Sequence, residues 1–171
     1  MKSSLFFTTL FFVLAACGQQ EDKSKRPSPP DSVNVILNNG TTVSVNYSQP
    51  AVKGRIIGKD LEPLPGKVWR TGANEATVFE IDKNAKIEGK DLPAGKYGLF
   101  TIANGNDWTI IFNRTWNQWG AFSYKDADDA LRVHVKSTKA KEFAERMKFQ
   151  ISKDGKVTLL WGDIKVDFKV G

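Results

Sequence analysis

Hydrophobic and polar residues alternate with a period of two along much of the chain. The segments 131–136 (LRVHVK) and 164–170 (IKVDFKV) show this clearly, and the pattern is typical of strands with one buried and one solvent-facing side. Asn-Gly and Asp-Gly turn signals lie between several such runs. We expect about nine strands, at 33–37, 42–47, 76–82, 85–88, 96–102, 108–113, 131–137, 146–152, and 156–161 with 163–170, the last two counted as a pair or as one bent strand.

Helix is expected to be scarce. Only the stretches 126–130 and 139–145 have helical character, and neither is long enough to form a layer. The sequence therefore predicts an all-β fold, an antiparallel β-sandwich or a small barrel. The irregular stretch 48–75, in which 53–57 could be a short strand, is where we expect binding residues, because loops on rigid sheets commonly carry them.

The N-terminal region predicts export and lipid anchoring. Lys2 precedes an apolar run over 5–14, which has the length of a signal-peptide core and is too short to span a bilayer. The run ends in Leu14-Ala15-Ala16-Cys17, which resembles the bacterial lipobox, and Cys17 is the single cysteine of the chain. We expect a signal peptide over 1–16, a lipid anchor and flexible Pro-rich tether over 17–31, and one domain over 32–171. The expected location is the cell envelope, at the outer membrane, with the membrane as partner through lipidated Cys17.

Composition excludes several classes of protein. With one Cys and one His, the chain cannot form an internal disulfide framework, a cysteine zinc site or an HExxH protease site. It also lacks a phosphate loop and a GxSxG elbow. Asp126, Asp128 and Asp129 lack the Gly and Glu of a calcium loop, so we interpret them as a polar turn. No cofactor and no metal are expected.

The formal net charge is +6, and the excess of basic residues lies in 132–171, with ten basic against five acidic residues. Such an excess can indicate nucleic acid, anionic lipid or acidic glycan as a partner. An envelope location argues against nucleic acid. Because the lysines alternate with apolar residues, we interpret the excess as the solvent-facing side of a sheet.

Two strings of the irregular stretch are distinctive: 50–55 (PAVKGR) and 66–77 (GKVWRTGANEAT). With the segments 87–100, 108–113, 118–121 and 131–133, they resemble a family of bacterial envelope proteins known as domain of unknown function 2911. The likeness covers about residues 48–171. It implies a secreted or lipid-anchored β-rich protein, and it implies no activity and no catalytic or binding residue.

The segment 69–75 (WRTGANE) is the densest cluster of polar and aromatic residues. Gly72 could adopt a left-handed turn that brings Arg70 and Glu75 to face each other. The candidate ligand-binding residues Trp69, Arg70, Asn74 and Glu75 could then contact a sugar hydroxyl or a carboxylate. In the interpretation that we favour, Arg70 and Glu75 instead pair with each other and fix the loop to the sandwich.

A second candidate loop follows the strand that ends at 113 and contains Trp116, Gln118 and Trp119. Two tryptophans in a polar loop could form a stacking platform for a sugar ring, or they could cap the end of the sandwich. We favour the second role for Trp119 and assign Trp69, Trp108 and Trp161 to the core. If the two loops share a ligand, they should lie together at one end of the sandwich.

The leading hypothesis is a non-enzymatic, membrane-anchored module that binds a ligand or partner in the envelope, such as a glycan or an envelope protein. One alternative is a glycan hydrolase with a carboxylate pair that includes Glu75, since such enzymes need two carboxyl groups. Another is a purely structural envelope protein.

Overall fold

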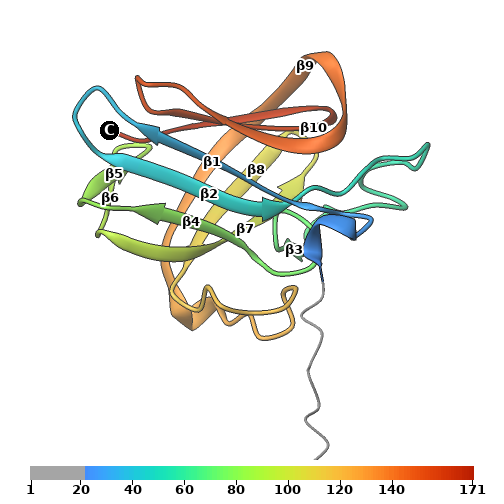
Figure 1. The fold of residues 1–171 in the computed structure, drawn as a ribbon, viewed down its shortest axis with the longest axis horizontal. Coiled ribbons are helices and arrows are strands. Elements are labelled where there is room, and N and C mark those ends of the chain that lie inside the picture. The colour runs from blue at the N-terminus through green and yellow to red at the C-terminus, as the bar shows by residue number, and fades with distance from the viewer. Residues whose placement is uncertain (1–21) are drawn as a thin grey trace, which may run out of the picture.

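The computed structural model describes residues 22–171, so the signal region and Cys17 lie outside the described residues. The fold is all-β, which confirms the expected class. A single antiparallel sheet curls into a half-barrel in the strand order β1-β2-β4-β7-β8-β9-β10, with β3 added to β7, and β5 and β6 form a separate two-stranded sheet (Figure 1).

The strands are β1 (Pro30–Ile36), β2 (Thr42–Ser48), β3 (Val68–Trp69), β4 (Thr77–Ile81), β5 (Ala85–Ile87), β6 (Lys90–Leu92), β7 (Gly95–Asn104), β8 (Asp107–Asn113), β9 (Asp129–Ile151) and β10 (Lys156–Lys169). Two 3-10 turns, η1 (Lys23–Lys25) and η2 (Asp126–Asp128), are the only helical elements of residues 22–171.

The main departure from the expected elements is in β9. Residues 139–145, expected to be helical, are part of this one continuous strand of 23 residues, so that expectation is wrong. β10 is one strand with register shifts around Gly162, which confirms the single bent strand. Residues 53–57 form turns and no named strand.

The core fills the concave side of the half-barrel, and alternate residues of several strands are buried in it. In β4 every second residue is buried, as expected for a sheet with one face turned to solvent. The rings of Phe79, Phe112 and Phe168 meet edge-on or tilted, with centroids 5.0–6.1 Å apart, a geometry that aromatic pairs favour. Trp69, Trp108 and Trp161 are at most 2% exposed, which confirms their assignment to the core.

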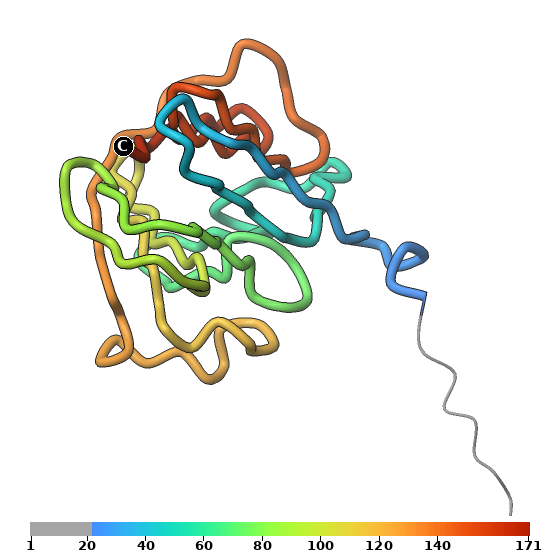
Figure 2. Tube along the Cα trace, turned by 60° about the vertical axis from the view of Figure 1, so that its left-hand side comes forward, coloured from blue at the N-terminus to red at the C-terminus, as the bar shows by residue number. Residues whose placement is uncertain are grey.

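The β9–β10 hairpin closes the open side of this core. β9 pairs first with β8 and then, beyond Lys136, with β10, so the hairpin folds back over β1 and β2. Phe149 N donates to the Tyr47 hydroxyl over 3.1 Å, and Met147 N donates to Pro50 O over 3.0 Å. Figure 2 shows the hairpin on the opposite side of the domain from residues 114–128.

A smaller apolar cluster lies on the outer face of the sheet. Ala76, Phe100 and Ile111 are buried there beneath Tyr124 and Ala121, and the Phe100 and Tyr124 rings are 5.0 Å apart. The long loop between β8 and β9 therefore packs against β7 and β8, and this contact fixes the second candidate loop in place.

Gly155, in the β9–β10 turn, provides a test of the fold. It has φ +91°, and an added Cβ would lie 1.9 Å from Val170 O. We expect Gly155→Ala to destabilise the domain by at least about 2 kcal/mol, from left-handed strain and the backbone clash. Thermal unfolding should show a fall of about 4–8 °C in Tm.

The matched control is Gly105→Ala. Gly105 also has a positive φ, +60°, but nothing lies within 4 Å of an added Cβ. Its cost should be the strain alone, about 1 kcal/mol. Equal losses of stability in the two variants would contradict the close approach of Gly155 to Val170.

Candidate functional site

The two candidate loops meet at one end of the half-barrel. Ala76 N donates to Gln118 O over 2.9 Å, Gly120 N donates to Asn74 O over 3.0 Å, and Glu75 forms an isolated antiparallel bridge with Trp119. The expectation that the loops lie together is thus confirmed. Backbone hydrogen bonds, more than side-chain contacts, join them.

In the loop after β3, the residues with left-handed backbone conformation are not the one that we expected, Gly72. Thr71 and Asn74 have φ of +52° and +58°, whereas Gly72 is not left-handed, so that expectation is wrong. Gly72 is needed for space, because an added Cβ would lie 2.9 Å from Thr77 Oγ1. Its carbonyl accepts a hydrogen bond of 3.0 Å from Trp69 Nε1, and the loop is thereby fixed to the core.

The expected pair of Arg70 and Glu75 is absent, so that interpretation is wrong. Glu75 binds the chain N-terminal to β1: Lys23 Nζ donates to it over 2.8 Å, and Arg26 Nη1 donates to both carboxylate oxygens over 3.0 and 3.1 Å. Burial raises the pKa of Glu75, but the hydrogen bonds from Lys23, from its own backbone and from Arg26 outweigh this effect and lower the pKa to about 2. Glu75 is therefore an ionised carboxylate near neutral pH.

Residues 22–29, which we call the N-terminal segment, lie against the domain. Asn74 Nδ2 donates to Ser28 O over 3.0 Å, and Gln49 N donates to Pro29 O over 2.9 Å. The Arg26 guanidinium carbon lies 5.8 Å from the centroid of the Trp119 ring, within the range of a cation–π contact. The expected tether ran to residue 31, whereas the chain contacts the domain from Lys23 onward and β1 begins at Pro30.

Arg70 lies in a separate pocket of about 200 Å³ beside this segment. Its wall includes Ser28 of the N-terminal segment, Glu62 and the buried indole of Trp161. Burial lowers the pKa of Arg70, and the charge of Glu62 partly opposes this effect. Arg70 Nε is buried, and none of residues 22–171 accepts a hydrogen bond from it.

Trp116 and Trp119 are 38% and 55% exposed. The favoured core role for Trp119 is therefore wrong. The Lys96 ammonium lies 5.6 Å from the centroid of the Trp116 ring, as Arg26 lies over Trp119. Gln118 Nε2 donates to Thr115 O over 2.6 Å and so stabilises the turn between the two tryptophans.

The seven candidate residues thus divide into three groups. Trp69 and Arg70 line the pocket; Asn74, Glu75 and Trp119 contact the N-terminal segment; and Trp116 and Gln118 belong to the adjoining loop. Sequence reasoning missed Arg55, Glu62 and Trp161 as pocket residues. The first two lie in the irregular stretch 48–75, so their place in that stretch was an available signal.

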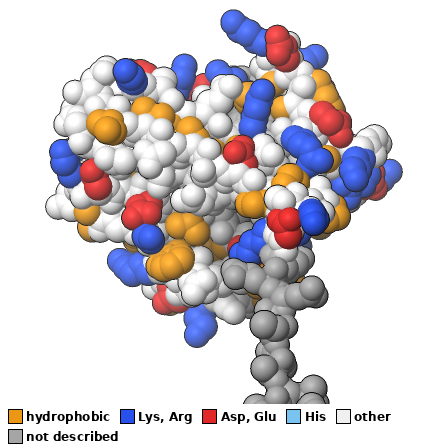
Figure 3. Space-filling model, viewed as in Figure 1, with side chains coloured by type: hydrophobic (Ala, Val, Ile, Leu, Met, Phe, Trp, Pro, Cys, Tyr) orange, Lys and Arg blue, Asp and Glu red, His pale blue; other side chains and the backbone are white. Residues whose placement is uncertain are grey.

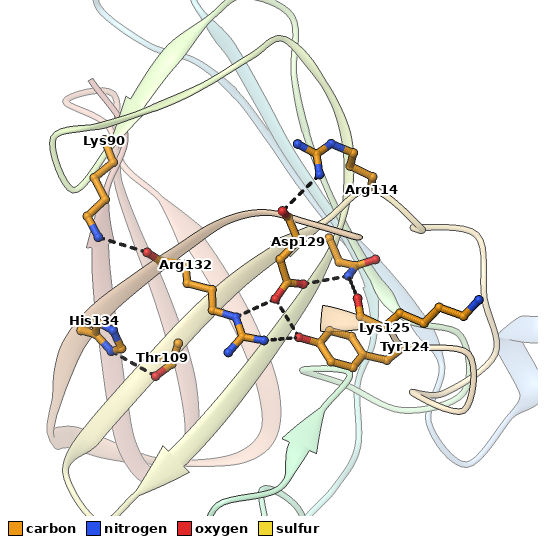
Figure 4. A network of polar contacts seen from close by, with 9 residues as sticks. Lys90, Thr109, Arg114, Tyr124, Lys125, Asp129, Arg132 and His134 are labelled. Atoms are coloured by element: carbon orange, nitrogen blue, oxygen red, sulfur yellow. Dashed lines mark hydrogen bonds and ion pairs between the residues drawn. The ribbon is translucent and has the colours of Figure 1, made fainter. Parts of the chain in front are cut away.

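A polar network anchors the loop that carries Trp116 and Trp119 (Figure 4). Asp129 accepts hydrogen bonds from Asn113 Nδ2, the Tyr124 hydroxyl and Arg132 Nε, over 2.8, 2.8 and 2.6 Å. Burial, and then Asp129, raise the pKa of Tyr124 to about 12. With its oxygens occupied in this way, Asp129 has a structural role. Among the described residues, no group of three His, Cys, Asp or Glu side chains could hold a metal ion.

The comparisons with known proteins give the family. A family model described as "Protein of unknown function (DUF2911)" matches residues 28–170. The chain belongs to this family. The match begins at Ser28, inside the N-terminal segment, and so includes every residue that lines the Arg70 pocket of this DUF2911 domain. No curated protein and no solved structure matches the chain. Within residues 22–171 we find no helix long and apolar enough to cross a membrane.

The contacts of Glu75 predict that its charge holds the N-terminal segment of the DUF2911 domain. Glu75→Gln keeps the shape of the side chain and removes the charge that attracts Lys23 and Arg26. Trypsin cleaves after Lys23 and Lys25 faster when the segment leaves the domain, because a protease needs the chain unfolded around the cleaved bond. We expect cleavage there to be about 3- to 10-fold faster in the variant, because the rate follows the population of the open form.

Glu80→Gln is the control, since Glu80 pairs with Lys96, outside the segment. Identical cleavage rates in the wild type and the Glu75→Gln variant would show that Glu75 does not hold the segment.

Proposed function

We propose that this DUF2911 domain is a non-enzymatic binding module, held at an envelope membrane by a lipid on Cys17, which binds the anionic group of a ligand through Arg70. The observation that carries the proposal is the Arg70 guanidinium. Its Nε is buried at a pocket wall and has no acceptor among residues 22–171.

A buried guanidinium N–H without an acceptor is costly. Buried polar groups are nearly always hydrogen-bonded, and an unsatisfied donor costs about 1–3 kcal/mol, more when it is charged. Glu62 supplies a compensating charge but no hydrogen bond to Arg70 in the structure, and its Oε2 accepts from Leu64 N over 2.7 Å. A carboxylate or phosphate in the pocket would accept from Arg70 in a geometry that suits the guanidinium fork.

The pocket sets the size of what can bind. Its volume of about 200 Å³ corresponds to about seven water molecules, which is less than a drug-sized ligand occupies. It therefore suits the acidic end of a larger molecule or a small organic acid. Trp69 and Trp161 give it apolar walls, and Arg55 lines it as a second cation.

The contacts of Glu75 support binding over glycan hydrolysis. A hydrolase of the usual type needs one carboxylic acid with a raised pKa to protonate the leaving group. The pKa of Glu75 is instead lowered to about 2, and both its oxygens accept from Arg26. Its observed contacts serve to hold the N-terminal segment.

The proposed anchor would bring this end of the domain close to the membrane. Asp22 follows Cys17 by five positions in the chain, and five extended Cα–Cα steps reach at most about 18 Å. Because the N-terminal segment is docked beside the Arg70 pocket, a lipidated Cys17 would keep the pocket near the membrane surface. A flexible tether up to residue 31 would have allowed nearly three times that reach.

Arg70→Gln tests the binding site. We expect the wild type to bind at least one of acetate, phosphate or glucuronate in calorimetric titration, and the variant to bind it at least about tenfold more weakly, from the loss of a charged hydrogen bond. Without ligand, Tm should stay unchanged or rise, because the variant removes a half-buried charge whose buried Nε has no acceptor among residues 22–171.

Arg114→Gln is the control, since the exposed Arg114 side chain lies outside the pocket lining. A clear fall in Tm for Arg70→Gln, together with no binding of any of these anions by the wild type, would favour a purely structural role for Arg70.

Cys17→Ser tests the anchor. We expect the variant to leave the membrane fraction, because two or three acyl chains, at about 0.8 kcal/mol for each buried CH₂, would otherwise hold the protein there. The measurement is fractionation with labelled palmitate. Unchanged fractionation, or label on the variant, would count against lipidation of Cys17.

A further inference from the structure

The β9–β10 hairpin is hollowed on the face turned away from the core. Lys148 and Gln150 alternate with the buried Met147 and Phe149 and so point away from the core. β10 bends strongly: Thr158 Oγ1 donates to Asp167 Oδ1 over 2.6 Å, although nine residues of straight strand would separate them by about 30 Å.

This bend encloses a trough of about 590 Å³. The size lies within the range of pockets that bind small organic molecules and short oligomers, about 300–1,000 Å³. Its lining shares no residue with the lining of the Arg70 pocket. The trough is therefore a second, independent feature of the domain.

The trough is strongly basic. Lys141, Lys148, Lys156 and Lys165 line it, against the single acidic residue Glu142. Lys165 pairs with Asp167 over 2.7 Å, whereas the other three lysines make no ion pair with residues 22–171. Figure 3 shows basic side chains on many parts of one face of the domain, but in the trough they surround a concave surface. A large part of the basic excess of residues 132–171 is gathered here.

Apolar side chains lie among these lysines. Phe143, 55% exposed, lines the trough with Ile151 and Leu160. An aromatic ring beside aliphatic side chains offers a surface on which the C–H face of a sugar ring can pack. Gln150 and Ser152 supply polar groups to the same lining, and these could contact hydroxyl groups.

We propose that the trough binds a segment of an acidic glycan, with carboxylate or phosphate groups at Lys141, Lys148 and Lys156 and a sugar ring against Phe143. Charge complementarity favours an anionic chain. The concave shape favours a narrow chain over a planar lipid surface, which would touch only the rim. The inference does not depend on the Arg70 site or on Cys17.

The test measures the binding of oligogalacturonate to the chain without its expected signal peptide, residues 17–171. The variant Lys141→Gln/Lys148→Gln/Lys156→Gln should bind at least about tenfold more weakly. The control variant Lys59→Gln/Lys67→Gln/Lys125→Gln loses the same charge at exposed lysines outside the trough, and it should change affinity less than about twofold. Neutral maltooligosaccharide of the same length should not bind.

Phe143→Ala separates a glycan from other anions. It should weaken the binding of oligogalacturonate and leave any binding of poly-glutamate unchanged, because only the sugar packs on the ring. If both triple-lysine variants lost the same affinity for oligogalacturonate, net charge alone would explain the binding, and the proposal would be overturned. Tighter binding of poly-glutamate than of oligogalacturonate, binding of phosphatidylglycerol vesicles alone, or no binding of oligogalacturonate would also overturn it.

Discussion

One continuous strand holds the two halves of this domain together. β9 pairs with β8 through its first residues and with β10 through its remaining length, so it belongs both to the half-barrel and to the hairpin that closes it. Without this change of partner along one strand, the aromatic core around Phe79 and Phe112 would stay open to water on the concave side. The sheet thereby covers its own core without a helix layer.

Both proposed sites follow from the path of β9. On its inner side, Val52 N donates to Glu145 O and Met147 N donates to Pro50 O, over 2.9 and 3.0 Å. These bonds hold the irregular chain after β2 in place, and that chain supplies Arg55 and Glu62 to the Arg70 pocket. On the outer side of the β9–β10 hairpin, the bend of β10 encloses the basic trough. A bound ligand at either site would contact the hairpin or residues attached to it.

The N-terminal segment is held by many weak contacts of different kinds. Exposed ion pairs such as that of Lys23 and Glu75 each contribute only about 0–1 kcal/mol. The segment also has the backbone bond from Gln49 to Pro29, the amide bond from Asn74 to Ser28 and the packing of Arg26 over Trp119. Ser28 of the segment forms part of the wall of the Arg70 pocket, so release of the segment would open that pocket. Anchoring of the chain and binding at Arg70 are therefore physically linked in this proposal.

The alternation of residues along the chain predicted most strands, the all-β class and the apolar face of 157–161 to which the buried Trp161 belongs. This succeeds because period-two burial is a local property of any strand with one wet face. The stretch 139–145, expected to be helical, is strand instead, and Ala140 and Ala144, four positions apart, are both buried in it. In the structure β9 bulges here: it advances by five positions from Lys139 to Ala144, where β10 advances by two from Gly162 to Ile164.

The order of residues alone shows that the loops of 69–75 and 114–120 carry an unusual concentration of aromatic and polar groups. What those groups contact depends on the three-dimensional fold. Glu75 finds its partners 52 and 49 residues away, at Lys23 and Arg26, and leaves Arg70 in a different pocket. Partners so distant in the chain are chosen by how the sheet curls, and no local pattern of residues records that curvature, because hydrogen bonds and ion pairs depend on separations in space of about 3 Å.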